Sequence, residues 1–287
     1  MRAFAYERPE SIADAVGLLA EHGPEARLLA GGTDLIIRLR EGTIRPRVVV
    51  DVKRIAELDG GIRETEAGLT IGARATMTAI GADDRIRRDF TALSEAAAVV
   101  GAVQIRNRAT LAGNICNASP AADTVPALLT FDAVVVAAGP GGTRRIALDE
   151  LLVRSGVTTL ARDELVTAIE LPQPDLARAS AHLRRTRRRG HDLAAVTIAC
   201  VVRADGRTRI AYGSLGPRPL LVGDDSGLLA DAAAADAVKA ALLAQLFTDA
   251  SPSPRSMRAS PDYRLAMLHV LGMRAVRTAI ERLAGAR

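Results

Sequence analysis

A short apolar strand runs directly into a pair of glycines near the start of the chain, and this junction limits the folds open to it. The strand spans residues 27–30 and is followed by Gly31-Gly32-Thr33-Asp34. Paired glycines adopt backbone conformations that other residues avoid, so successive N–H groups can point into one concavity that accepts a phosphate. A plain strand-to-helix turn, with Thr33 or Asp34 capping the helix, explains the same residues. The loop alone favours this plainer interpretation.

A second stretch of unusual composition lies between residues 104 and 126. It is rich in Asn, Gly, Ser and Pro and is too irregular for one regular element. Within it, residues 106–123 combine hydroxyl and amide side chains with many apolar residues. A segment of this kind buries polar groups that need partners, and an extended polar ligand would supply them. A polar turn over a sheet is an equally good interpretation of this stretch alone.

The pattern of apolar residues predicts three mixed units of helix and strand, over residues 1–57, 58–175 and 176–287. Ser11 caps a first helix, and Asp205-Gly206 joins two strands in a hairpin. The predicted strands are 27–30, 47–52, 69–71, 133–138, 165–171, 196–202 and 207–212, and the predicted helices are 11–19, 76–83, 94–100, 231–247 and one from Ser260-Pro261 almost to the end. Glycines at 139–142 predict a further hairpin turn, and Pro-Gln-Pro at 172–174 is interpreted as a linker.

The composition excludes several classes of protein. The net charge is +5, but lysine occurs only at positions 53 and 239, so nearly all of the 38 basic residues are arginine. This skew resembles a bias of codon composition. Aromatic residues make up only 2%, so the chain lacks the stacking rings of single-strand nucleic-acid binders, and we expect no nucleic-acid partner. The 48% of apolar residues indicates a globular core, and no apolar run is long enough to span a bilayer.

The two cysteines bear on location and redox chemistry. Cys116 and Cys200 are too few for a disulfide scaffold or for an iron–sulfur cluster, which needs four ligands. The amino terminus has no apolar block after its first arginine, so we expect no secretory signal and a cytoplasmic location. We expect Cys116 to act as a small buried apolar residue without a redox role.

Most common catalytic and binding motifs are missing. No G-x-G-x-x-G follows a strand and no G-x-x-x-x-G-K-[ST] occurs, which argues against a Rossmann dinucleotide site and a P-loop. The four histidines lack the spacing of metal ligands, so we expect no metal site. The sequence therefore predicts no catalytic side chain, and the two loops remain as the candidate binding sites.

Taken together, the two loops resemble the FAD-binding signatures of the flavoprotein (medium) subunit of the molybdenum hydroxylases, the xanthine dehydrogenase and carbon monoxide dehydrogenase family. The signatures are Gly31-Gly32-Thr33-Asp34 and the stretch 110–123, and the resemblance extends over nearly the whole chain, including residues 9–19, 50–55, 104–107 and 260–264. It implies an α+β protein, with a vanillyl-alcohol-oxidase-type FAD-binding fold of two α/β subdomains followed by a carboxyl-terminal α+β domain.

The resemblance also implies which residues bind FAD. Backbone N–H groups of the first loop would wrap the pyrophosphate, the second loop would grip it from the other side, and Asp123 would accept hydrogen bonds from hydroxyl groups of the flavin chain. The implied FAD-binding residues are Leu28, Leu29, Ala30, Gly31, Gly32, Thr33, Asp34, Leu35, Gly101, Thr110, Gly113, Asn114, Asn117, Asp123, Val166 and Arg184.

Arg184 stands where the family often has a lysine near the flavin, after an aromatic residue whose place is taken here by His182. Most of the arginine-rich run 184–189 is interpreted as a basic face toward solvent or another subunit. Leu193 is a candidate for apolar packing near the isoalloxazine ring, and Val166 for a backbone contact to the cofactor.

For function, the resemblance implies the electron-transfer subunit of a heterotrimeric oxidoreductase. A large subunit would carry the molybdenum cofactor and a small one two [2Fe-2S] clusters, from which electrons would reach FAD and then an external acceptor. Gly-Gly-Thr-Asp is closer to the xanthine dehydrogenase branch, which often uses NAD as the acceptor. A free-standing flavin oxidase and a non-enzymatic module for another phosphate ligand are the alternatives.

Overall fold

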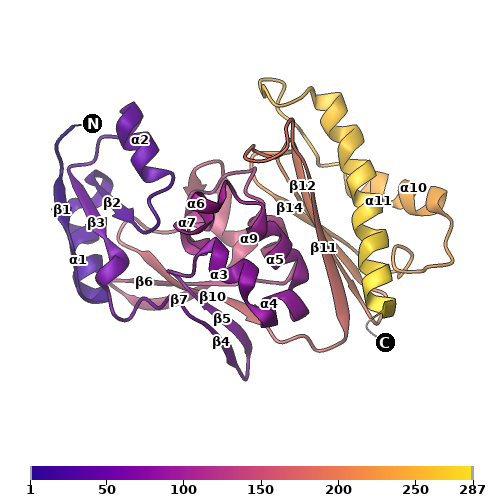
Figure 1. Ribbon diagram of the computed structural model, residues 1–287, viewed down its shortest axis with the longest axis horizontal. Coiled ribbons are helices and arrows are strands. Elements are labelled where there is room, and N and C mark those ends of the chain that lie inside the picture. Colours follow the sequence, from indigo (N-terminus) through magenta and orange to yellow (C-terminus); the bar gives the residue numbers. More distant parts are fainter. Residues whose placement is uncertain (1, 286–287) are drawn as a thin grey trace.

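The computed structural model describes residues 2–285, and Figure 1 shows its three larger sheets one after another along the long axis. The first sheet is parallel, of order β1-β3-β2 (Ala5–Glu7, Val48–Asp51 and Ala26–Leu29). α1 (Ile12–His22) packs on it and is capped by Ser11, whose side chain accepts a hydrogen bond from the Asp14 N–H. The predicted first helix is confirmed, with an end three residues later than predicted. The 3₁₀ turn Gly23–Glu25 leads to β2, α2 (Leu35–Glu41) follows the glycine pair, and a second 3₁₀ turn, Val52–Arg54, follows β3.

The second sheet is antiparallel, of order β4-β5-β10-β6-β7. Its strands are Ile62–Thr65, Gly68–Gly72, Leu165–Pro172, Val134–Gly139 and Gly142–Ala147. Between β5 and β6 the chain forms α3 (Met77–Ala82), α4 (Asp84–Asp89), α5 (Thr91–Ala98), α6 (Val103–Arg106), α7 (Leu111–Cys116) and α8 (Thr124–Thr130). Short α9 (Leu148–Leu151) and the strand pair β8–β9 (Leu152–Arg154, Val157–Thr158) separate β7 from β10. The hairpin predicted from the glycines at 139–142 is confirmed as β6–β7.

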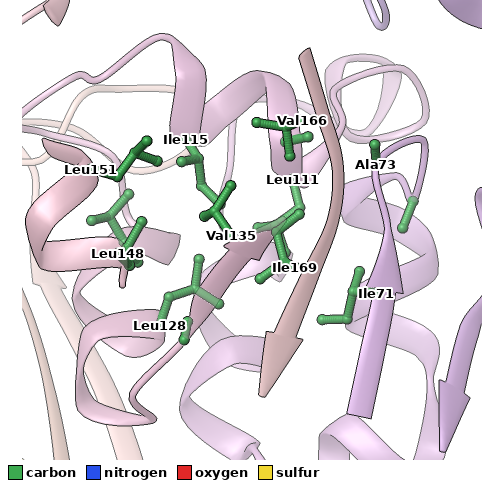
Figure 2. Packing of buried hydrophobic residues seen from close by; sticks show 14 of the residues in the cluster. Ile71, Ala73, Leu111, Ile115, Leu128, Val135, Leu148, Leu151, Val166 and Ile169 are labelled. Atoms are coloured by element: carbon green, nitrogen blue, oxygen red, sulfur yellow. The ribbon is translucent and has the colours of Figure 1, made fainter. Parts of the chain in front are cut away.

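The stretch 104–126 holds more regular structure than its composition predicts. It contains most of α6, all of α7 and the start of α8. The Thr110 hydroxyl caps α7, and Leu111 and Ile115 of this helix are completely buried. Figure 2 shows both residues close to Val135 of the second sheet. The prediction that this stretch is not one regular element is confirmed, and its polar residues cap short helices that bury an apolar face.

The third sheet is antiparallel and covered on both faces. Its order is β11-β12-β13-β14 (Arg178–Arg185, Val196–Arg203, Thr208–Gly213 and Leu220–Asp224). α11 (Pro261–Gly285) packs along β11 and β12, with α10 (Asp236–Leu246) beside it, and α5 and α8 pack on the sheet's other face (Figure 1). Along β12, Ile198 and Cys200 join the core beneath α11, whereas Ala199 and Val201 join the core of the first two sheets. Burial on both faces explains why β12 is apolar at nearly every position, with Thr197 as the buried polar exception.

Two further predictions concern this part of the chain. The hairpin at Asp205-Gly206 is confirmed by the pairing of β12 with β13. The helix predicted over 231–247 begins only at Asp236 in α10, because the Asp231 carboxylate accepts a hydrogen bond from the Ala233 N–H and holds the preceding residues in a turn. No helix within residues 2–285 is both long enough and apolar enough to cross a membrane.

Candidate functional site

The glycine loop that joins β2 to α2 lies against the chain just before α7. A Cβ added to Gly31 would come within 2.1 Å of the Arg108 carbonyl oxygen, so only glycine fits there. Gly32 has a φ of +77°, which glycine adopts without strain. Among residues 2–285, the N–H groups of Gly31, Gly32 and Thr33 find no hydrogen-bond acceptor. The three residues are half-buried, and N–H groups without partners are what a phosphate-binding loop presents to its ligand.

A hydrogen bond between side chains joins this loop to the second one. Asn117 Nδ2 donates to Asp34 Oδ1 over 3.4 Å. Asp34 precedes α2 but makes no side-chain cap to it, so the plain interpretation in which Asp34 caps the helix does not describe this turn. The two FAD signatures predicted from the sequence are therefore in contact.

Several residues of the second loop also stabilise α7 and its surroundings. Thr110 Oγ1 accepts a hydrogen bond from the Gly113 N–H at 3.1 Å, and a Cβ on Gly113 would come within 2.9 Å of that oxygen. Asn114 Oδ1 accepts a hydrogen bond from Thr124 Oγ1 at 2.7 Å. These bonds account for the residue types at 110, 113 and 114 within the protein, and their predicted contacts to FAD stay predictions. Gly101 has a φ of +55° and ends the turn before α6.

Asp123, immediately before α8, forms a nearly buried ion pair with Arg184 of β11. The distance from Arg184 Nη1 to Asp123 Oδ2 is 2.8 Å, and the two side chains are only 15% and 8% exposed. The second carboxylate oxygen, Oδ1, is buried and accepts no hydrogen bond from the described residues. Burial raises the pKa of Asp123 to about 6, a rise that the positive charge of Arg184 limits. The site therefore contains one buried acceptor that a ligand hydroxyl would satisfy.

The other predicted residues are spread more widely. The other arginines of the run 184–189 differ in their surroundings. Arg185 donates to the Tyr263 hydroxyl, and Arg187 pairs with Asp192. Arg188 and Arg189 are exposed. Leu193 is 52% exposed, whereas the Val166 side chain lies in the core, where Figure 2 labels it. Leu28, Leu29, Ala30 and Leu35 are half-buried beside the glycine pair. Cys116 is exposed, so the expectation that it is a buried apolar residue was wrong.

Sequence reasoning gave no role to two polar residues that the structure places beside Asp123. His182 and Thr197 are buried, and His182 Nε2 lies 3.0 Å from Thr197 Oγ1 and 3.8 Å from Asp123 Oδ1. The available signal was the alternation along residues 178–185, which places positions 182 and 184 on one face of a strand. That strand, β11, was not predicted because its arginines suggested a solvated surface.

The arrangement offers complementary groups to one extended ligand. Free N–H donors lie at the glycine pair. Asp34 beside this pair is hydrogen-bonded to Asn117 of the second loop, and Asn114 of that loop is hydrogen-bonded to Thr124. Thr124 follows Asp123, which carries the free oxygen. An anionic pyrophosphate needs such donors, and a polyhydroxyl chain needs such an acceptor, so the residues fit FAD. Within residues 2–285, no cluster of three or more His, Cys, Asp or Glu side chains is arranged to hold a metal ion.

Comparison with known proteins agrees with this chemistry over both halves of the chain. The model of the FAD binding domain in molybdopterin dehydrogenase matches residues 2–174. The model of the CO dehydrogenase flavoprotein C-terminal domain matches residues 181–279. The chain therefore belongs to the FAD-binding subunits of the molybdenum hydroxylase family, and it is an oxidoreductase subunit. The family resemblance noted from the two loops is confirmed.

Individual relatives match over almost their full length. The chain is 32% identical over 281 residues to the xanthine dehydrogenase FAD-binding subunit of Escherichia coli O157:H7, covering 96% of each. It is 32% identical over 286 residues to the carbon monoxide dehydrogenase medium chain of Hydrogenophaga pseudoflava, covering 98% of each. A chain of the reconstituted CO dehydrogenase from Oligotropha carboxidovorans superposes with a TM-score of 0.90 at 30% identity, covering 98% of this chain and 99% of that chain. The mixed helix and strand fold is thus that of a CO dehydrogenase medium chain.

Proposed function

We propose that this chain carries electrons from iron–sulfur clusters of a partner subunit through FAD to an external acceptor. One observation carries the proposal: unpartnered N–H donors at Gly31-Gly32-Thr33 and an unpartnered buried acceptor on Asp123 occur on segments that the Asp34–Asn117 and Asn114–Thr124 hydrogen bonds join. FAD, when bound, supplies redox chemistry that accepts and releases one or two electrons. The protein's part is to bind and orient the cofactor, and no side chain of this chain acts on the organic substrate.

The residues divide by the part of FAD that they would hold. The N–H groups of the glycine loop, flanked by Leu28–Ala30 and Leu35, would bind the pyrophosphate from one side. Residues of the second loop (Thr110, Gly113, Asn114 and Asn117, with Gly101 before them) would approach it from the other side. Asp123 would accept from the hydroxyl chain, and Arg184 would hold the Asp123 carboxylate in place. Val166 would offer a backbone group, and Leu193 would pack near the flavin ring.

The arrangement of sheets supports a division into three units. Residues 1–57 and 58–175 would form the two subdomains of a vanillyl-alcohol-oxidase-type FAD-binding fold, because each contains its own sheet, and one apolar core packs the two sheets together. Residues 176–287 would form the carboxyl-terminal α+β domain, because the third sheet and α11 share a second core. The flavin would then lie where Asp123 of the second unit meets Arg184 of the third.

The partner subunits are inferred from the metal cofactors that this chain has no ligands to hold. With two cysteines it holds no iron–sulfur cluster, so electrons from a molybdenum cofactor must arrive through a small [2Fe-2S] subunit and a large molybdenum subunit. The relatives named medium chain and FAD-binding subunit support such an assembly. We propose NAD as the acceptor, because the exposed arginines Arg188 and Arg189 follow closely after Arg184 and suit a dinucleotide pyrophosphate.

Two measurements test this function. The full chain should bind FAD without a covalent bond, so acid precipitation should release the flavin into the supernatant; flavin that stays with the pellet would contradict this. The complete complex, reduced without oxygen by a stoichiometric amount of dithionite, should show flavin reoxidation when NAD is added. If a quinone or a dye reoxidises the flavin and NAD does not, the acceptor assignment is wrong but the electron-transfer function stands. A flavin that no acceptor reoxidises would count against that function.

A further inference from the structure

A buried hydrogen bond lies beside the Asp123 carboxylate on the inner face of the third sheet. In the antiparallel pairing of β11 with β12, Arg184 lies directly opposite Thr197. His182, two residues before Arg184, lies on the same face of β11. All three side chains therefore face Asp123, which precedes α8 on the neighbouring layer. His182 is 7% exposed and Thr197 is fully buried, so water does not compete for their hydrogen bonds.

The bond between His182 and Thr197 uses the ring nitrogen that lies nearest to Asp123. His182 Nε2 is 3.0 Å from Thr197 Oγ1 but 3.8 Å from Asp123 Oδ1, beyond hydrogen-bond distance. The nearby carboxylate favours the tautomer that carries hydrogen on Nε2, because a lone pair there would repel the carboxylate charge. Nε2–H then donates to Thr197, and the Thr197 hydroxyl, which lies close to the Asp123 carboxyl group, helps to lower the pKa of Asp123. Asp123 Oδ1 is left without a partner.

We propose that Thr197 is a positioning residue that holds His182 away from Asp123, so that Oδ1 stays free to accept a hydroxyl hydrogen bond from FAD. Without the Thr197 hydroxyl, the buried Nε2–H would lose its acceptor, which is costly in a buried site. Asp123 Oδ1 is then an acceptor 3.8 Å away, which a small movement of the ring brings within hydrogen-bond range. His182 would then occupy the oxygen that FAD needs. This inference rests on the proposed assignment of Asp123 to FAD.

The charges around the cluster support a neutral His182. Burial, together with the nearby Arg184 guanidinium, lowers the pKa of His182 to about 3. From α5, the Glu95 carboxylate accepts the backbone N–H of His182 and pairs with Arg282 of α11, so its charge is already compensated. Between pH 6 and 8, His182 therefore competes for Asp123 as a neutral donor, and protonation of its ring plays no part.

The test compares FAD affinity among variants of the full chain, by titration of the FAD-free protein with FAD. Thr197→Val keeps the shape and removes the hydroxyl, and it should weaken FAD binding about tenfold, since one acceptor of the site is lost. Thr197→Ser restores a hydroxyl and should bind within about twofold of the wild type. Thr208→Val is the matched control: it removes another buried hydroxyl of the third sheet, in β13, and should leave FAD affinity unchanged.

A double variant distinguishes the positioning role of Thr197 from a merely structural role of its side chain in the third sheet. His182→Phe combined with Thr197→Val removes the competing N–H and should recover FAD affinity, whereas a merely structural role of Thr197 predicts that it binds no better than the single variant. Circular dichroism establishes that each variant is folded, and Thr197→Ala replaces the valine variant if that one is not. Wild-type affinity in Thr197→Val, or no recovery in the double variant, overturns the inference.

Asp123→Asn distinguishes an error in the positioning role of Thr197 from an error in the assignment of Asp123 to FAD. If Asp123→Asn weakens FAD binding while Thr197→Val does not, the positioning role is wrong and the FAD site stands. If Asp123→Asn binds FAD as the wild type does, the assignment of Asp123 to FAD is wrong, and the inference falls with it.

Discussion

At the scale of single residues, Asp123 links FAD binding to pH. Burial raises its pKa to about 6, so in the FAD-free chain the carboxyl group is largely protonated at pH 5 and ionised at pH 7. The ionised form is the better acceptor for FAD hydroxyls, so FAD affinity should rise as the pH is raised from 5 to 7. Below the pKa the increase approaches about tenfold per pH unit. FAD titrations at a series of pH values measure it.

The matched variant is Asp123→Asn, which keeps the shape and cannot ionise. It should bind FAD more weakly at pH 7.5 and lose most of the pH dependence; an unchanged pH profile would show that another group titrates. Stability of the FAD-free chain responds in the opposite sense. The folded chain holds this proton more tightly than the unfolded chain does, so the contribution of Asp123 to the free energy of unfolding falls as the pH rises through about 6.

At the scale of elements, Gly31 joins the β2–α2 connection to the chain before α7. Because an added Cβ would meet the Arg108 carbonyl oxygen at 2.1 Å, the backbone itself would have to move. We expect Gly31→Ala to lower the free energy of unfolding by about 1–3 kcal/mol and to abolish FAD binding at micromolar concentrations. Urea denaturation and FAD titration measure the two effects.

Gly17→Ala provides the control, because Gly17 lies exposed within α1 with no atom within 4 Å of an added Cβ. There alanine should raise the free energy of unfolding by about 0.5–1 kcal/mol, since it lowers the backbone entropy lost on folding. If both variants keep wild-type stability and FAD affinity, the close approach of the two loops does not matter for binding.

At the scale of the whole molecule, Glu95 connects the second unit to the third. One carboxylate oxygen accepts the His182 N–H of β11, and the other pairs with Arg282 of α11. Removing the Glu95 carboxylate leaves the buried His182 N–H without an acceptor, so Glu95→Ala should lower the free energy of unfolding by about 1–3 kcal/mol. The ion pair is about one-third exposed on each side and adds little.

Urea denaturation of Arg282→Ala tests whether the buried His182 N–H bond contributes more stability than the ion pair. This substitution breaks the same ion pair and removes a hydrogen bond to the Ser180 carbonyl, but it leaves the His182 N–H with its acceptor. It should therefore cost less stability than Glu95→Ala does. A larger loss in Arg282→Ala would mean that the ion pair, and not the buried N–H, holds the units together.

The assembly is also a property of the whole molecule. We expect the native complex that contains this chain to carry molybdenum and iron besides FAD, because this chain supplies no ligands for an iron–sulfur cluster. Metal analysis of the complex purified from its source measures this, with the chain expressed alone as the control. FAD without either metal in the native complex would contradict the proposed electron path.

Much of the local structure and both loops of the candidate site could be predicted because short-range rules determine them. Ser11 caps the nearest helix, Asp205-Gly206 forms a hairpin, and the glycine pair follows its strand, as the residue types require. Each depends on residues a few positions apart, so each can be recognised without knowing what packs on it. The family motifs were recognisable for the same reason.

Only the tertiary structure decided which distant groups meet. Arg184 and Asp123 are 61 residues apart, and the run that contains Arg184 has the composition of a solvated surface. Its contact with Asp123 depends on the pairing of β11 with β12 and on the packing of α8 on that sheet, because the alternation of a strand turns His182 and Arg184 inward together. The free oxygen of Asp123 also follows from packing, since composition cannot show which buried acceptor is left without a donor.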